Sequence, residues 1–196
     1  YLRSIPNMII AAPMDEIELR NLMFTAQLRN YGPFAIRYPR GRGVKSEWQE
    51  PFKEIEIGKS RLISKGKDIA ILSVGHPGNF VIEATDRLNE EGISVEHIDM
   101  RFVKPLDEKR LQDIFSNFSQ IITVEDGTIV GGFGSAVVEF MTEQGFKANI
   151  KRMGVPDRFI EQGTQQELYK ECGFDAEGIY YTVKSMVKHR VLSKVS

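Results

Sequence analysis

The sequence contains one cysteine, Cys172, among 196 residues, which excludes an internal disulfide and favours a reducing compartment. It has no apolar run near the roughly 20 residues that span a bilayer, and no signal-peptide pattern at its start. Basic and acidic residues nearly balance, 26 against 27, giving a formal net charge of −1. This balance gives no support to binding of nucleic acid or of a membrane surface. Together these absences favour a cytoplasmic protein with neither of those partners.

Apolar residues make up 41% of the chain and charged residues 27%, an ordinary globular composition. The clearest pattern lies between residues 121 and 141. It opens with a β-branched run at 121–124, typical of a strand buried on both faces, and continues through a glycine-rich turn at 127–134. Apolar residues then recur at helical spacing. This strand, turn and helix predict an α/β fold.

Alternation of strands and helices continues over residues 54–190, which predicts a mostly parallel sheet with helices on both faces, as in an α/β domain. We expect its first strand at 54–63. Residues 1–43 suggest a strand, a helix and a second strand, too little to close a core, so they are expected to be the end of a second α/β domain that begins upstream. The polar stretch 44–53 predicts a linker, and 191–196 a tail.

Polar residues mark the expected helix starts. Asp15 with Glu18, and Thr164 with Glu167, stand at capping-box spacing. Asp107 begins a further helix. Within the linker, Trp48 is interpreted as docked on a neighbouring surface.

The glycine-rich turn does not match a nucleotide-binding motif. Counted from Gly132, the dinucleotide pattern needs a small residue where Val137 stands. Counted from Gly127, the phosphate-loop pattern needs lysine where Phe133 stands. The favoured interpretation is that these glycines permit a tight turn and close packing of a helix on the sheet.

Several candidate residues follow strand ends, where α/β proteins bind ligands. Glu125 and Asp126 follow the buried strand, although the favoured interpretation is that they are either solvated in the loop or partners of a helix N-terminus. His76 follows another strand end; a structural role is the favoured interpretation, and a functional role stays open as the alternative. The three histidines show no i, i+4 ligand pair, and Cys172 is interpreted as a packing residue. Spacing alone nominates no catalytic triad.

A basic turn gives the strongest chemical signal. Arg37, Arg40 and Arg42 follow a short strand, in a turn that also contains Pro39 and Gly41. Guanidinium groups bind phosphate through two parallel hydrogen bonds. A phosphate site and a merely solvated basic turn are equally compatible with this pattern.

Seven segments are informative together: 37–41, 99–107, 124–125, 131–135, 154–157, 159–160 and 162–165. With these segments, the chain resembles the 1-deoxy-D-xylulose-5-phosphate synthase family of transketolase-like enzymes. The segments occur in that family's order and cover nearly the whole chain. The acid with the glycine loop, and the Pro-Leu-Asp element, are shared across the superfamily, whereas the basic turn and the Pro-Asp and Gln-Gly-Thr-Gln segments are more specific.

The resemblance implies a transferase that condenses pyruvate with glyceraldehyde 3-phosphate and releases carbon dioxide, supplying isoprenoid, thiamine and pyridoxal biosynthesis. It implies thiamine diphosphate and Mg²⁺ as cofactors of a homodimeric full-length enzyme. Such enzymes have three domains, and this chain matches the end of the pyrimidine-binding domain and all of the C-terminal one.

By the same resemblance, Arg40 would bind the phosphate of glyceraldehyde 3-phosphate, with Arg37 and Tyr38 in support. No catalytic, cofactor-binding or metal-binding residue is expected in this chain, so the chain alone would be inactive and bind no cofactor. The alternatives are the C-terminal region of a transketolase or of a 2-oxo-acid dehydrogenase β subunit, and a noncatalytic dimerisation module.

Overall fold

The computed structural model describes residues 1–28, 31–41, 43–45 and 47–192. Arg42 of the basic turn and residues 193–196 of the expected tail lie outside the described residues. The helices are η1 (Leu2–Ser4), α1 (Glu16–Ala26), α2 (Gly78–Glu90), α3 (Glu108–Asn117), α4 (Phe133–Glu143), α5 (Gln165–Cys172) and α6 (Ala176–Leu192). The strands are β1 (Ile9–Ala11), β2 (Phe34–Ile36), β3 (Arg61–Ser64), β4 (Ile69–Val74), β5 (Val95–Asp99), β6 (Phe102–Lys104), β7 (Gln120–Thr128) and β8 (Asn149–Val155).

A five-stranded sheet forms the centre of the larger part of the chain. Its strand order is β3-β5-β4-β7-β8; β4 pairs in parallel with β5 and β7, β7 pairs in parallel with β8, and only β3 pairs antiparallel, at one edge. Every residue of β4 is buried, as expected for a strand covered on both faces. The predicted α/β fold with a mostly parallel sheet is confirmed.

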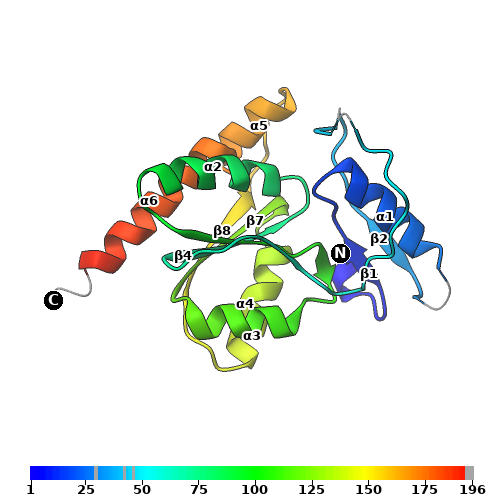
Figure 1. Ribbon diagram of the computed structural model, residues 1–196, viewed down its shortest axis with the longest axis horizontal. Helices are drawn as coiled ribbons and strands as arrows, with labels where there is room; N and C mark the ends of the chain where they lie inside the picture. Colours follow the sequence, from blue (N-terminus) through cyan, green and yellow to red (C-terminus); the bar gives the residue numbers. More distant parts are fainter. Residues whose placement is uncertain (29–30, 42, 46, 193–196) are drawn as a thin grey trace.

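Two separate apolar cores lie on the two faces of this sheet. Helices α2 and α6 cover one face and α3 and α4 the other (Figure 1). On the first face Val81 and Leu88 of α2 pack with Val183 of α6. On the second, Leu111 of α3 packs with Val137 of α4. Among the described residues, no helix combines the length and apolar character needed to cross a bilayer.

The strand expected at 121–124 is longer than its apolar run. It continues to Thr128, which pairs with Val155 of β8 beyond an irregularity in the register. Helix α4 then follows with the predicted apolar stripe. A Cβ at Gly132 would overlap the carboxylate of Glu125 and the carbonyl of Thr128. The interpretation of this glycine as a close-packing residue is therefore confirmed.

We expect Gly132→Ala to destabilise the protein by about 1–3 kcal/mol, the usual cost of forcing atoms into a packed site, because the Thr128 carbonyl belongs to the backbone and the Glu125 carboxylate is held by Phe133 N. The midpoint of urea unfolding would measure the change. Gly163→Ala is the matched control, since the nearest atom to its Cβ is the flexible Leu168 side chain, at 3.1 Å. Equal effects of the two substitutions would contradict the packing argument.

A three-stranded sheet of order β2-β1-β6 joins the first residues to the larger part of the chain. Strand β1 pairs in parallel with β2, and antiparallel with β6, where Ala11 faces Phe102. Phe102 is fully buried beside Leu22 and Ile55. Nothing in the sequence pattern indicates this pairing. The proposed bounds 1–43, 44–53 and 54–190 stay predictions, while the pairing shows that residues on either side of the linker share one sheet.

The segment before β3 differs from its expected form. The strand expected at 54–63 is limited to Arg61–Ser64, because Gly58 turns the chain at a φ of +73°. Ser60 then donates to Asp107 Oδ2 from both its backbone nitrogen, at 2.9 Å, and its hydroxyl, at 2.8 Å. Asp107 also caps α3 by accepting from Arg110 N. The segment is thus fixed by a polar contact to the start of a helix.

Of the two expected capping boxes, the one at Thr164 and Glu167 is confirmed. At the start of α1, Asp15 accepts from Glu18 N at 2.9 Å as expected. The Glu18 carboxylate instead accepts from Met14 N and binds two arginines. The capping box expected at Asp15 and Glu18 is therefore wrong: Asp15 caps the helix, but the Glu18 carboxylate is bound in a buried ionic contact and does not reach back to the cap.

The expected linker contains no helix or strand among its described residues and runs along α1. Arg20 of α1 donates to the carbonyls of Trp48 and Glu50 at 2.7 and 2.8 Å. Its guanidinium also lies 5.2 Å from the ring centre of Trp48 and 4.5 Å from that of Phe52, as in cation–π contacts. The docking of Trp48 is confirmed.

Candidate phosphate-binding site

The basic turn after β2 lies close to three other elements and is bonded to two of them. Arg37 N donates to Ala11 O of β1 at 2.9 Å, and the Arg37 guanidinium forms an ion pair with Asp126 of β7 at 3.2 Å. A Cβ on Gly41 would lie 2.7 Å from the side-chain oxygen of Gln165, the first residue of α5. The turn therefore lies where the small sheet, the end of the large sheet and α5 meet.

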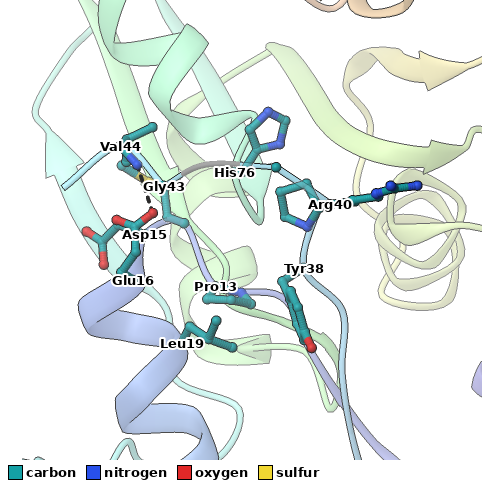
Figure 2. A pocket seen from close by; sticks show the side chains of 12 residues that line it. Pro13, Asp15, Glu16, Leu19, Tyr38, Arg40, Gly43, Val44 and His76 are labelled. Atoms are coloured by element: carbon teal, nitrogen blue, oxygen red, sulfur yellow. Dashed lines mark hydrogen bonds between the residues drawn. The ribbon is translucent and has the colours of Figure 1, made fainter. Parts of the chain in front are cut away.

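A pocket of about 320 Å³ opens beside this turn. Figure 2 shows Arg40 and His76 on the side of the pocket away from Asp15 and Glu16, with the Arg40 side chain extending away from these acids. Tyr38 is 60% exposed and also faces the pocket. The complete lining consists of Pro13, Met14, Asp15, Glu16, Leu19, Tyr38, Pro39, Arg40, Gly41, Gly43, Val44 and His76.

The two acids of the pocket already accept backbone hydrogen bonds. Asp15 caps α1, and the two oxygens of Glu16 accept from Val44 N at 2.7 Å and Lys45 N at 2.9 Å (Figure 2). Arg40 is exposed, and no carboxylate in the described part of the chain forms an ion pair with it. Arg40 thus carries an uncompensated guanidinium at the outer side of the pocket (Figure 2), which suits an anionic ligand there.

The structure separates the arginines of the turn by their contacts. Arg37 is engaged by Asp126, so its guanidinium anchors the turn. Arg40 has no such anchor among the described residues. This arrangement agrees with a binding role for Arg40 and a supporting role for Arg37 and Tyr38, and these roles stay predictions.

The two acids at the end of β7 have different partners. Glu125 is 5% exposed and accepts from Phe133 N and Gly134 N, both at 2.8 Å, at the start of α4. Burial raises the pKa of Glu125, while these two hydrogen bonds oppose the rise. Its interpretation as a helix N-terminal partner is confirmed. For Asp126 the sequence missed the contact with Arg37, because the two residues lie far apart in the chain and no local spacing joins them.

Cys172 is half-buried and packs against the core on the α2 and α6 face. Burial raises the pKa of its thiol, which disfavours the thiolate. The packing interpretation is confirmed.

Over the described ranges, no group of three or more His, Cys, Asp and Glu side chains could hold a metal ion, so these residues do not fit the Mg²⁺ that the resemblance implies.

The fold and the glycine-turn unit correspond to a known class. The chain belongs to the family of transketolase C-terminal domains, whose family model matches residues 58–179. It is 58% identical over 95% of its length to the 1-deoxy-D-xylulose-5-phosphate synthase of Cytophaga hutchinsonii and 52% identical over 93% to that of Bacteroides fragilis. It covers 29% and 28% of these relatives, so it spans less than a third of their length. The resemblance found in the sequence is confirmed.

Two solved structures share the fold. A split-gene transketolase, described as an inactive β4 tetramer, matches 95% of this chain and 59% of its own with a TM-score of 0.80 and 28% identity. A transketolase variant from Pichia stipitis matches 95% of this chain and 26% of its own with a TM-score of 0.68 and 17% identity. The second likeness shows the fold alone.

Proposed function

We propose that this chain is the C-terminal part of a 1-deoxy-D-xylulose-5-phosphate synthase, which condenses pyruvate with glyceraldehyde 3-phosphate and releases carbon dioxide. The observation that carries the proposal is the 58% identity over 187 residues to a synthase of that name. The product would supply isoprenoid, thiamine and pyridoxal biosynthesis. The full-length enzyme would be a cytoplasmic homodimer that uses thiamine diphosphate and Mg²⁺, both held outside this chain.

Within this proposal, Arg40 binds the phosphate of glyceraldehyde 3-phosphate. Its exposure beside the pocket and its lack of a carboxylate partner among the described residues support this role. The phosphate is remote from the reacting aldehyde carbon, so the contact uses binding energy away from the chemistry to orient the acceptor. Arg37, held by Asp126, fixes the turn that presents Arg40, and Tyr38 lines the pocket beside it in support.

The test uses the full-length protein that contains this chain, supplied with thiamine diphosphate and Mg²⁺. We expect pyruvate and glyceraldehyde 3-phosphate to yield equal amounts of carbon dioxide and 1-deoxy-D-xylulose 5-phosphate, and the isolated chain to yield none. Turnover of xylulose 5-phosphate as donor without turnover of pyruvate would instead identify a transketolase. Dependence on a lipoyl-carrying partner would identify a 2-oxo-acid dehydrogenase subunit, and absence of any turnover would favour a noncatalytic module.

A further inference from the structure

His76 is held rigidly in the wall of the Arg40 pocket. It follows β4 through Gly75, whose φ is +76° and whose Cβ would lie 3.1 Å from that of Ala12. Asn79 Nδ2 donates to the carbonyl of His76 at 2.9 Å and to that of Met14, another pocket residue, at 2.8 Å. The Asn79 side chain therefore links the backbone of His76 to that of Met14 in the pocket wall.

Two aromatic rings fix the plane of the His76 imidazole. Phe80 meets it edge-on at 5.1 Å between ring centres, and Tyr169 lies at 4.9 Å. Nδ1 is buried and has no hydrogen-bond partner among the described residues. Because His76 lines the pocket and Nδ1 is enclosed, Nε2 is the ring nitrogen that can meet a ligand there.

The charge state of His76 suits a neutral hydrogen-bond donor. Burial lowers its pKa, the nearby Asp126 opposes this change and Arg37 reinforces it. A neutral imidazole keeps one ring proton, and in the tautomer protonated on Nε2 that proton is the one available to a ligand, because Nδ1 is enclosed. No hydrogen bond joins His76 to Asp15 or Glu16 in the described structure, and Figure 2 places both acids on the other side of the pocket.

We propose that His76 is a second binding residue for the phosphate group that Arg40 recognises, donating a hydrogen bond from Nε2 to a phosphate oxygen. The inference rests on the proposed function, because it places the phosphate of the acceptor substrate in this pocket. Arg40 binds two oxygens through its planar fork, and the third oxygen of a phosphate monoester is then available to His76. The ligand class is a small phosphate monoester such as glyceraldehyde 3-phosphate.

Two variants of the full-length enzyme separate binding from packing. His76→Phe keeps an aromatic ring between Phe80 and Tyr169 and removes the donor, whereas His76→Gln keeps an N–H donor near the position of Nε2. We expect His76→Phe to raise KM for glyceraldehyde 3-phosphate about tenfold, as for loss of a hydrogen bond to a charged group. The kcat and the KM for pyruvate should stay near their original values, and His76→Gln should recover most of the loss.

Unphosphorylated glyceraldehyde, used as a second acceptor, distinguishes phosphate binding from a structural role. We expect His76→Phe to leave kcat/KM for this acceptor unchanged, and an equal loss with both acceptors would overturn the inference. An increased KM in Arg40→Ala with none in His76→Phe would also overturn it while leaving the proposed function intact. If neither variant changed KM for the phosphorylated aldehyde although the enzyme formed its product, the phosphate would bind elsewhere, and both His76 and Arg40 would lose their roles.

Discussion

Arg40→Ala in the full-length enzyme is expected to raise KM for glyceraldehyde 3-phosphate by one to two orders of magnitude. Hydrogen bonds to charged groups contribute about 1.5–3 kcal/mol, and each 1.4 kcal/mol corresponds to a factor of about ten. Arg40 has no carboxylate partner among the described residues, so its removal leaves no buried acid unpaired and should not destabilise the fold. Steady-state kinetics with either substrate varied in turn would measure the effect.

Two further variants sharpen that experiment. Arg40→Lys keeps the charge and loses the planar fork, so it should give an intermediate KM. Arg110→Ala, on α3 and outside the lining of the Arg40 pocket, is a matched control that should leave KM for both substrates unchanged. An unaltered KM for the aldehyde in Arg40→Ala, together with impaired handling of pyruvate, would contradict the assignment.

The basic turn illustrates how far sequence reasoning reaches at this site. Its composition indicates phosphate binding, because several arginines follow a strand end. It does not distinguish Arg37 from Arg40, since that difference depends on Asp126, which comes from the end of β7. His76 lines the same pocket but belongs to a different element, so its place next to Arg40 is a property of the folded chain alone.

For the fold, too, the sequence predicts the features that depend on neighbouring residues and misses those that depend on contacts between distant segments. Apolar periodicity and caps such as Thr164 predict the helices and the mostly parallel sheet, because these signals act within a few residues. Strand β6 is three residues long, and it forms because β1 offers a free edge. The part of β7 beyond Val124 likewise depends on Thr128 pairing with β8. Contacts between distant segments therefore account for the differences between the predicted and the observed strands.

The largest such contact is a buried ionic cluster between α1 and the large sheet. Glu18 is 3% exposed and accepts from Arg101 Nε at 2.6 Å, with Arg61 3.6 Å away. Arg61 also donates to the fully buried Asp99 at 2.9 Å. Burial raises the pKa of Asp99 to about 8, and the negative charge of Glu18 adds to that rise. Two acids and two arginines thus bind each other across the boundary between the small and large sheets.

The same cluster fixes the backbone that forms the pocket wall. Glu18 Oε2 accepts from Met14 N at 2.8 Å, and Met14 lines the pocket beside Arg40. Arg101 has a φ of +59°, and its carbonyl accepts from Ala12 N at 2.8 Å. Loss of Glu18 would therefore affect both the stability of the fold and the position of the 12–15 segment.

We expect Glu18→Gln to destabilise the chain by up to about 3 kcal/mol, the lower end of the usual cost of removing one partner from a buried ion pair, because the partly buried Arg101 then loses its counter-charge. The midpoint of urea unfolding would measure the change.

Lys53→Ala is the matched control: its pair with Glu50 is exposed and 3.7 Å long, so we expect a loss below about 1 kcal/mol. Combining Glu18→Gln with Arg101→Gln should cost less than Glu18→Gln alone, since no unpaired charge of that pair remains and an acceptor for Met14 N is kept. Equal stability of Glu18→Gln and Lys53→Ala would show that the cluster does not hold α1 to the large sheet.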